Sequence, residues 1–414
     1  MSGHPGALTL CDLTQSYSAK GGGVKTYLLE KRRFILERTD ANHCLIVPGE
    51  RDRIIRDGRA TTIEIASPQV PGSPNYRLLI RTNAVLKALR EARPNVIECQ
   101  DAYNLPWTAL YYRRRHPETA LVAGYHTDFP TVYVERYLAP RAGAYVARQV
   151  RRLAYRYAAS VYSRFDAFYT LTQMAAEHFG ALGIEEPKIL TLGADTSLFD
   201  KARRSEELRA KLGVGPTAPL LVYAGRIDHE KKARLVVEAF RKLPPSWNAG
   251  LVMLGDGKDR LALTEECAAG ENIHFPGFVD DRETLAAYFA SSDIYVSAME
   301  NETFGVSVIE AQAAGLPVVG VRAGAMIDRV PPSLGRLGPC GDADAMSANI
   351  AAVWMDRLSG IGDRARAHAR DNFSWPKTFE TLLFRIYPEA LKNRTGKELP
   401  ELLEQPQNSR AQAS

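Results

Sequence analysis

The segment from Asp293 to Gly320 reads "DIYVSAMENETFGVSVIEAQAAGLPVVG". Its apolar run 293–299 predicts a buried strand, residues 300–305 form a polar turn, and residues 306–314 have the composition of a helix. Residues 315–320 return as a second apolar run. A strand, a crossover helix and another strand in this order predict a parallel sheet with helices packed on it.

The same alternation runs through most of the 414 residues, in one series from residue 7 to 126 and another from residue 219 onward. A chain of this length exceeds one ordinary core. We therefore predict two doubly wound α/β domains, an N-terminal one over residues 1–190 and a C-terminal one over residues 191–375. A helix over residues 376–391 is expected to return to the N-terminal domain, and the polar tail 392–414 reads as disordered.

Composition narrows the class of protein. The net charge of +5 is too small to indicate a nucleic-acid partner. Five cysteines are scattered without a C-x-x-C pair, which is typical of reduced thiols and indicates neither a disulfide framework nor a zinc site. No apolar run approaches the ~18–20 residues that span a bilayer, and the N-terminus lacks the layout of a signal peptide. We expect a cytoplasmic protein.

The start of the helix at residue 306 predicts an anion site, because the N–H groups of Gly305, Val306 and Ser307 are unsatisfied donors there. Glu310 follows more than one turn later on a face of small residues, where it should accept hydrogen bonds from a group such as a ribose diol. Glu302 lies in the turn, at the rim of the same site. Alternatively, Glu302 is an acid favoured by the helix dipole and Glu310 is an exposed helix residue. This alternative accounts for each glutamate separately but not for the occurrence of both in one segment.

Two other strand ends carry candidate phosphate contacts, since ligands of open α/β sheets bind at the carboxyl ends of strands. Three glycines at residues 21–23 follow the first strand, and a phosphate could approach their backbone closely. A plain flexible turn explains them equally well. Arg226 and Lys231 follow the first strand of the second series and suit a diphosphate. Arg226 offers a planar guanidinium that can form two parallel hydrogen bonds, and Lys231 offers a mobile ammonium. A solvated charged loop is the alternative.

Taken together, these segments resemble the retaining GT-B glycosyltransferases of family four, over about residues 7–390. "ENETFGVSVIEAQAAGLPVVG" matches the E-x(7)-E motif of that family. "GGGVKTYL" resembles its donor-phosphate loop, "YHTDFPTVY" its histidine loop, "LGADTSLF" its interdomain segment and "AGRIDHEKK" its phosphate clamp. "LGDG" and "HFPGFVDD" resemble the loops around the nucleotide base, whereas "VRAGAMIDRV" departs from the family pattern with a single Gly324.

The resemblance implies two Rossmann-like domains facing a central cleft, with an N-terminal acceptor domain and a nucleotide-sugar held mainly by the C-terminal one. It implies no metal and no other cofactor. Arg226 and Lys231 would neutralise the diphosphate, and Glu310 would bind the ribose hydroxyls. Glu302 and the backbone around Thr303, Phe304, Gly305 and Val306 would hold the transferred sugar.

The remaining roles that the resemblance implies fall on three loops. Gly22 or Gly23 would touch the distal phosphate, and Val279 would lie near the base. His126 would sit beside the reacting sugar, donating to a hydroxyl or assisting the phosphate, although a histidine after an apolar strand is also often a satisfied core residue. Asp128 could orient His126 or meet the acceptor.

Chemically, the departing nucleoside diphosphate develops negative charge that Arg226, Lys231 and a helix N-terminus are placed to stabilise. The candidate catalytic set is His126, Arg226, Lys231 and Glu302, with Glu302 as a sugar-binding group. Retention in such enzymes is described as attack on the same face with the phosphate accepting the proton, so we assign Glu302 no role as a nucleophile.

The acceptor is indicated by residues 134–165, where seven arginines interleave with tyrosine, valine and leucine against the single acid Glu135. These residues are expected to form a helix, which could lie on an anionic membrane with Arg148, Arg151 and Arg152 toward the headgroups, or could be a solvated basic helix packed on its own domain. Because "HTDFPTVY" resembles lipid mannosyltransferases and sulfolipid or diacylglycerol glycosyltransferases, we expect hexose transfer to a glycerolipid at the inner face of the cell membrane. The alternatives are a soluble transferase for a sugar phosphate or cyclitol and a non-catalytic binding module. The sequence leaves UDP and GDP equally open as the nucleotide.

Overall fold

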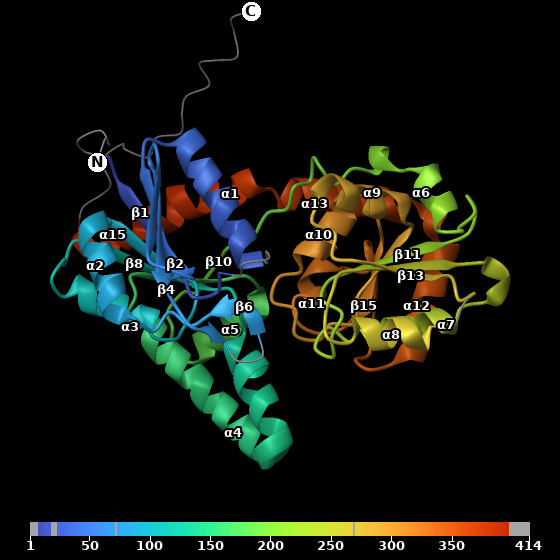
Figure 1. Cartoon of the computed structure of the whole chain (residues 1–414), viewed down its shortest axis with the longest axis horizontal. Coiled ribbons are helices and arrows are strands. Elements are labelled where there is room, and N and C mark those ends of the chain that lie inside the picture. Colours follow the sequence, from blue (N-terminus) through green and yellow to red (C-terminus); the bar gives the residue numbers. More distant parts are fainter. Residues whose placement is uncertain (1–6, 18–22, 71–72, 268–269, 397–414) are drawn as a thin grey trace, which may run out of the picture. The chain divides into compact units, whose positions relative to one another are not determined.

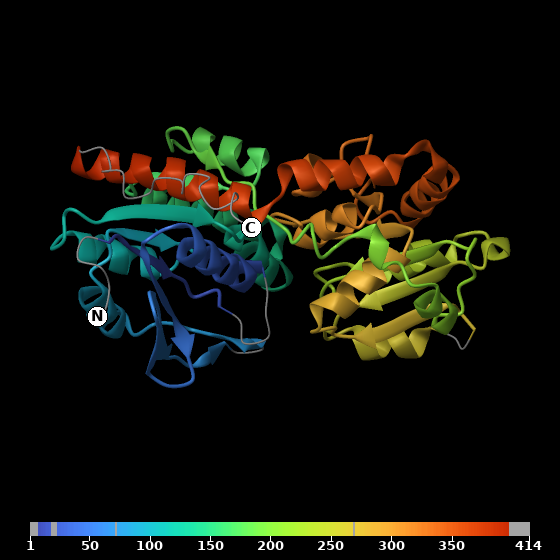
Figure 2. The same cartoon turned by 90° about the horizontal axis from the view of Figure 1, so that it is seen from above.

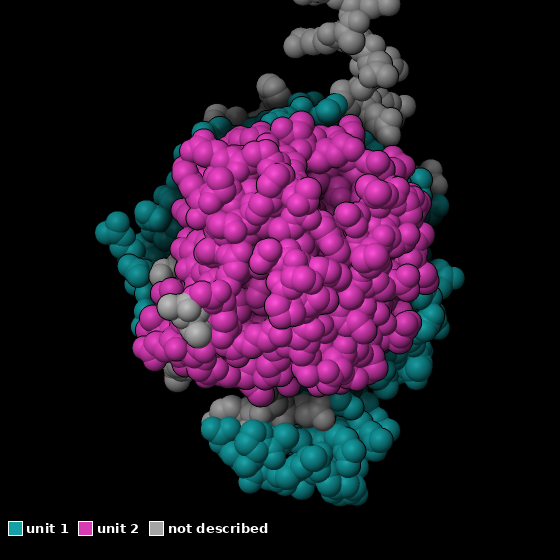
Figure 3. Space-filling view, turned by 90° about the vertical axis from the view of Figure 1, so that its right-hand side faces the viewer, with its two compact units in different colours: residues 1–191, 375–414 teal, residues 192–374 magenta. Residues whose placement is uncertain are grey.

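The computed structural model describes residues 7–17, 23–70, 73–267 and 270–396. The chain divides into two compact units, residues 1–191 with 375–414 and residues 192–374, coloured separately in Figure 3. The predicted boundary after residue 190 lies one residue from this division. Each unit is built on a sheet that carries helices (Figure 1).

Unit 1 holds an eight-stranded sheet in the order β10-β9-β8-β7-β1-β2-β4-β3. All neighbouring pairs are parallel except β3 with β4. The strands are β1 (Thr9–Leu13), β2 (Asn42–Gly49), β3 (Arg53–Asp57), β4 (Ala60–Ala66), β7 (Val96–Cys99), β8 (Ala120–Tyr125), β9 (Ala167–Thr170) and β10 (Lys188–Ile189), with a separate pair β5 (Gln69–Val70) and β6 (Ser73–Arg77). Residues 50–77 carry no strand predicted from the sequence. Every residue of β3 is exposed, so this edge strand lacks the buried apolar run that marked the others.

The helices of unit 1 come from both ends of the chain. The C-terminal part, α14 (Trp375–Thr381), a π-helical turn at Leu382–Ile386 and α15 (Tyr387–Thr395), belongs to this unit, and α15 lies across β8 and β9 (Figure 2). The prediction of disorder from residue 392 is wrong for residues 392–395, which form the last turn of α15. The residues from 397 onward lie outside those described. The other helices are α1 (Gly23–Arg38), α2 (Thr82–Ala92), α3 (Leu105–Arg113), α4 (Arg136–Tyr162) and α5 (Gln173–Ala181).

The basic segment does not form one straight helix. Gly143 inside α4 has φ 82° and ψ 156°, a conformation that ends one helical arm and starts another. Pro140 precedes the break. The prediction of a continuous helix over residues 134–165 is therefore wrong, because α4 is a hairpin whose tip projects from unit 1 (Figure 1).

Unit 2 holds a six-stranded, wholly parallel sheet in the order β13-β12-β11-β14-β15-β16. The segment Asp293–Gly320 forms β14, α10 and β15, as predicted. The strands are β11 (Leu220–Ala224), β12 (Gly250–Leu254), β13 (Ile273–Gly277), β14 (Ile294–Val296), β15 (Val318–Val321) and β16 (Gly335–Gly338). The helices are α6 (Glu206–Lys211), α7 (Ala233–Arg241), α8 (Arg260–Glu266), α9 (Arg282–Ser291), α10 (Val306–Ala313), α11 (Met326–Arg329), α12 (Ala343–Met355) and α13 (Ile361–Asn372).

The strand order places the candidate site. In unit 2 the chain runs outward from β11 on one side and from β14 on the other, so the order reverses between these two neighbours. In unit 1 the reversal falls between β1 and β7. Loops that leave the carboxyl ends of such strands diverge and leave a crevice for a ligand. Within the described ranges, no helix is both long and apolar enough to cross a bilayer.

Candidate functional site

Lys231 and Glu302 meet where the loops after β11 and β14 diverge. The Lys231 ammonium lies 3.1 Å from Oε2 of Glu302, and both side chains are largely buried. The sequence placed these residues on two separate loops and gave no sign of a direct contact. Strand pairing between β11 and β14 creates it, because adjacent parallel strands end at the same edge of the sheet.

The other oxygen of Glu302 caps the start of α10. Oε1 accepts a hydrogen bond of 3.2 Å from the N–H of Gly305, so the prediction that this N–H is unsatisfied is wrong. The N–H groups of Val306 and Ser307 make no hydrogen bond within the described part of the chain. Gly305 has φ 83°, a left-handed conformation that favours glycine. Glu302 therefore stabilises the start of α10, as the alternative interpretation held. Its carboxylate also binds the ammonium of Lys231.

The backbone of the Glu302 turn is fixed by the loop after β15. The carbonyl of Glu302 accepts a hydrogen bond of 2.8 Å from the N–H of Ala325. A Cβ atom on Gly324, whose φ is 54°, would overlap the carbonyl oxygens of Glu300 and Glu302. The single glycine in this loop thus allows close backbone packing under the turn. Thr303 is half-buried, whereas Phe304 is buried against the guanidinium of Arg329, 4.4 Å from its ring centre.

Glu310 lies inside unit 2 and is only 5% exposed, so its description as an exposed helix residue is wrong. Its Oε1 accepts a hydrogen bond of 2.8 Å from the guanidinium of Arg282 at the start of α9. Burial raises the pKa of Glu310, and Arg282 opposes that shift. Arg282 also lies over the ring of Phe199 at 4.9 Å. Arg282 is not among the residues predicted from the sequence, because nothing in its local pattern marks it as the partner of a residue 28 positions away.

Arg226 lies on a loop that packs backbone to backbone against its neighbour. The N–H of Gly225 donates to the carbonyl of Leu254 at 2.9 Å, and a Cβ on Gly255 would overlap the carbonyl of Gly225. Only glycine therefore fits at position 255. The Arg226 guanidinium is more than half exposed and pairs with the carboxylates of Asp228 and Glu230.

Val279 follows β13 and is half-buried, next to Phe278, which is 58% exposed. The carbonyl of Gly277 accepts a hydrogen bond of 2.8 Å from the N–H of Gly255, so this loop joins the loop after β12. The loops after β11, β12 and β13 thus form one connected edge in unit 2.

In unit 1 the structure brings the first helix to His126. Gly22 lies outside the described residues, and Gly23 is the first residue of α1. One turn further on, the ring of Tyr27 lies 4.7 Å from the ring of His126. The first turns of α1 and the residue that follows β8 therefore meet in unit 1.

His126 is 5% exposed, and its Nε2 lies 2.8 Å from the hydroxyl of Tyr169 on β9. Burial lowers the pKa of His126 to about 4, so the ring is neutral near pH 7. The prediction that Asp128 could orient His126 is wrong. Its carboxylate instead accepts hydrogen bonds from Tyr125 at 2.8 Å and Tyr155 at 2.7 Å.

Two comparisons by sequence decide the family. A model described as glycosyl transferases group 1 matches residues 204–371, and one described as a glycosyl transferase 4-like domain matches residues 22–194. The chain belongs to the group 1 glycosyltransferases. Their predicted GT-B fold, with two Rossmann-like domains, is confirmed by a likeness to solved structures.

The glycosyltransferase resembles proteins from bacteria and plants. It is 26% identical over 397 residues to the GDP-mannose-dependent alpha-(1-6)-phosphatidylinositol dimannoside mannosyltransferase of Mycobacterium tuberculosis, covering 92% of this chain and 96% of that protein. It is 33% identical over 203 residues to the sulfoquinovosyl transferase of Arabidopsis thaliana, covering 47% and 39% of the two chains. The solved sucrose-phosphate synthase of Thermosynechococcus elongatus superposes with a TM-score of 0.72 at 18% identity, covering 92% and 98%.

The predicted membrane arginines of the glycosyltransferase lie on the second arm of α4. Arg148 and Arg152 are exposed, and Arg151 is half-buried. Tyr145, at 68% exposure, lies beside the hairpin tip. Exposed apolar side chains also follow one face of this arm at helical spacing, namely Val146, Leu153 and Tyr157.

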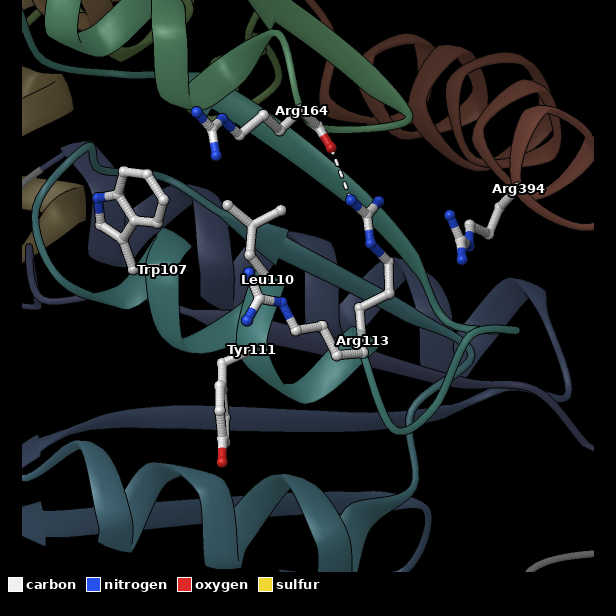
Figure 4. A pocket seen from close by; sticks show the side chains of 7 residues that line it. Trp107, Leu110, Tyr111, Arg113, Arg164 and Arg394 are labelled. Carbon is white, nitrogen blue, oxygen red and sulfur yellow. Dashed lines mark hydrogen bonds between the residues drawn. The ribbon is translucent and has the colours of Figure 1, made fainter.

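Unit 1 also has a hollow of about 500 Å³ (Figure 4). Trp107 of α3 donates from Nε1 to the hydroxyl of Tyr157 at 2.9 Å, and the guanidinium of Arg164 lies 5.1 Å from the Trp107 ring centre. Arg113 is held by Asp166 at 2.9 Å and by the backbone carbonyl of Arg164 at 2.8 Å. The full lining is Trp107, Leu110, Tyr111, Arg113, Arg114, Arg164 and Arg394. None of the predicted donor residues lies in it.

Proposed function

We propose that this glycosyltransferase moves a hexose from a UDP- or GDP-linked sugar to a membrane glycerolipid, with retention of configuration and without a divalent metal. The observation that carries the donor part is the contact of Lys231 with Glu302 beside the two unsatisfied N–H groups of α10. A cation and a helix N-terminus together favour a phosphate group.

The diphosphate would be bound by Lys231, Arg226 and the N–H groups of Val306 and Ser307. The ion pairs of Arg226 with Asp228 and Glu230 lie at the surface, where such a pair contributes only ~0–1 kcal/mol to protein stability. A diphosphate can therefore compete with these carboxylates for the guanidinium. These groups would stabilise the charge that develops on the departing nucleoside diphosphate. In this proposal they take the role that a divalent metal serves in other transferases.

The two glutamates would bind hydroxyl groups. A carboxylate offers about four lone-pair directions, so Glu310 can accept bonds from ribose hydroxyls while its Oε1 accepts from Arg282. Glu302 already holds Lys231 and Gly305, which fixes its carboxylate at the end of α10. A sugar attached to a phosphate bound there would meet this carboxylate and the backbone from Thr303 to Val306.

The acceptor part is supported by the α4 hairpin and by a relative whose name includes a lipid. The stretch Arg136–Tyr162 contains no acidic residue. Its second arm combines exposed apolar side chains with arginines, a pattern typical of helices that lie in a membrane interface. The name of the mycobacterial relative specifies GDP-mannose and a phosphatidylinositol dimannoside. The inner face of the cell membrane is where we propose that the enzyme meets its acceptor.

Calorimetric titration with UDP and with GDP tests the donor site. We expect one of the two to bind and its dissociation constant to be the same with EDTA as with added Mg²⁺. Binding only in the presence of Mg²⁺ would remove the metal-independent part of the proposal. If neither nucleotide bound under either condition, the donor assignment would be wrong and a non-catalytic role would gain weight.

Co-sedimentation with vesicles tests the membrane surface. We expect binding to vesicles of phosphatidylglycerol and phosphatidylcholine, little binding to phosphatidylcholine alone, and a decrease with salt. The double variant Arg148→Glu/Arg152→Glu changes the local charge by four. At about 1 kcal/mol of membrane-binding free energy per charge, this change weakens the attraction by several kcal/mol, so vesicle binding should fall at least ~10-fold.

The matched control is Arg336→Glu/Arg370→Glu, which changes the net charge equally on exposed arginines of unit 2 and should leave vesicle binding unchanged. Equal losses in both double variants would show a general charge effect and no dedicated α4 surface. No sedimentation of the unaltered enzyme at low salt would favour a soluble acceptor such as a sugar phosphate.

A further inference from the structure

The ring of His126 has one hydrogen-bond partner within the described residues, the hydroxyl of Tyr169 at 2.8 Å from Nε2. Tyr169 lies on β9, directly beside β8, with Gly124 as its register partner. Either atom of this pair can be the donor in principle, because a neutral imidazole carries one proton on either nitrogen. The other contacts of Tyr169 decide which one donates.

The hydroxyl proton of Tyr169 is directed away from His126. Its oxygen lies 2.9 Å from Oε1 of Glu98, a carboxylate that can only accept. Burial raises the pKa of Tyr169 well above its ordinary value, so the hydroxyl keeps its proton. If that proton pointed at His126 instead, two oxygens with lone pairs would face each other at 2.9 Å in a dry interior, which is unfavourable.

Glu98 is held as an acceptor by the groups around it. Its Oε2 lies 3.1 Å from the ammonium of Lys31 and accepts from the hydroxyl of Tyr387 at 2.7 Å. Its Oε1 also accepts from Tyr27 at 2.9 Å and from the amide of Gln100 at 2.9 Å. The hydroxyl of Tyr27 is 3.2 Å from that of Tyr169, and if Tyr169 were the donor in that contact its proton would again point away from His126.

We infer that Tyr169 is a positioning residue that holds His126 as the Nε2–H tautomer, so that Nδ1 accepts a hydrogen bond from a hydroxyl of the bound sugar. The contact between Nδ1 and the sugar rests on the proposed function, whereas the tautomer follows from the contacts of the protein alone. It changes the expected role of His126, because a neutral ring of this tautomer cannot donate from Nδ1 to the sugar. The low pKa of His126 agrees with a neutral ring.

The fold makes room for this contact at Gly124. A Cβ atom built on Gly124 would overlap the hydroxyl of Tyr169 and would press on Cδ2 of His126. Gly124 lies inside β8, where glycine weakens a strand and indicates close approach by a neighbouring group. Here that group is the phenol of Tyr169, whose hydroxyl meets Nε2 of the histidine ring.

Nitrogen-15 NMR of histidine-labelled protein tests the tautomer without any need for activity. Two-bond proton–nitrogen correlations report which ring nitrogen carries the proton, and a His126→Asn variant identifies the His126 signals among the eight histidines. We expect an Nε2–H ring at pH 7 with a hydrogen-bonded proton shifted downfield. An Nδ1–H ring would overturn the inference.

Tyr169→Phe and Tyr27→Phe form a matched pair. Each removes one buried phenol that donates to Oε1 of Glu98, but only Tyr169 bonds to His126. We expect the downfield Nε2–H signal to be lost in Tyr169→Phe and kept in Tyr27→Phe. The same signal in both variants, or its loss from both, would overturn the role of Tyr169, and the unaltered protein still tests the tautomer if one variant fails to fold.

The sugar contact is tested by adding UDP-glucose or GDP-mannose to the labelled protein, with binding followed separately by calorimetry. An Nδ1 that accepts a hydroxyl should show an upfield nitrogen shift in the complex. Binding without that shift would overturn the hydroxyl contact while leaving the proposed function intact. If neither sugar nucleotide bound, the proposed function and the sugar contact would fail together, whereas the tautomer would still be decided on the protein alone.

Discussion

The Lys231→Ala enzyme is expected to turn over about 10²–10³-fold more slowly than the unaltered enzyme, the loss typical of removing one preorganised donor to a developing negative charge. Lys231 is largely buried and fixed by Glu302 at 3.1 Å, so its ammonium is held in place before a donor binds. Steady-state rates at saturating donor, with the acceptor in vesicles, measure the change.

Lys242→Ala is the control for this substitution, because it removes a lysine from the same unit that forms only an exposed ion pair with Asp344. We expect its turnover to be unchanged. A Lys231→Ala enzyme that loses less than about tenfold in turnover would contradict the assignment of Lys231 to the leaving diphosphate.

Glu310→Ala is expected to weaken donor binding by about 10- to 100-fold, since hydrogen bonds to a charged group contribute ~1.5–3 kcal/mol. Glu302→Ala should instead lower turnover more than donor affinity, because Glu302 holds Lys231 and the start of α10 where the charge develops. Calorimetry with the nucleotide gives the affinities, and initial rates give the turnover.

Glu265→Ala, which removes an exposed glutamate of α8, is the control for both substitutions and should change neither quantity. Arg282→Ala offers a second comparison, because it leaves the buried Glu310 carboxylate without its cation. We expect it to lower thermal stability more than Glu310→Ala does, since an unpaired buried charge is costly. Small and equal effects of Glu302→Ala and Glu310→Ala on rate and affinity would refute the roles given to both.

Much of the fold could be predicted because its signals are local. The apolar runs of β11, β12 and β14 are buried strands, and Gly305 starts α10 where the turn chemistry placed a helix end. The motifs also located Glu302 and Glu310 correctly on the turn and the helix. By contrast, β3 and the break in α4 were missed or misread, because an exposed edge strand and a single Gly143 carry little hydrophobic pattern.

The sequence by itself therefore determined two α/β units, the residues at their strand ends and the family to which the chain belongs. Only the tertiary structure decided the partner of each site residue. Lys231 is the partner of Glu302, Arg282 of Glu310, and Tyr169 of His126. The Lys231–Glu302 and Tyr169–His126 pairs join segments that neighbouring strands bring together, and the Arg282–Glu310 pair joins the packed helices α9 and α10. The order of strands and the pairing of helices are set by long-range packing, which local periodicity does not encode.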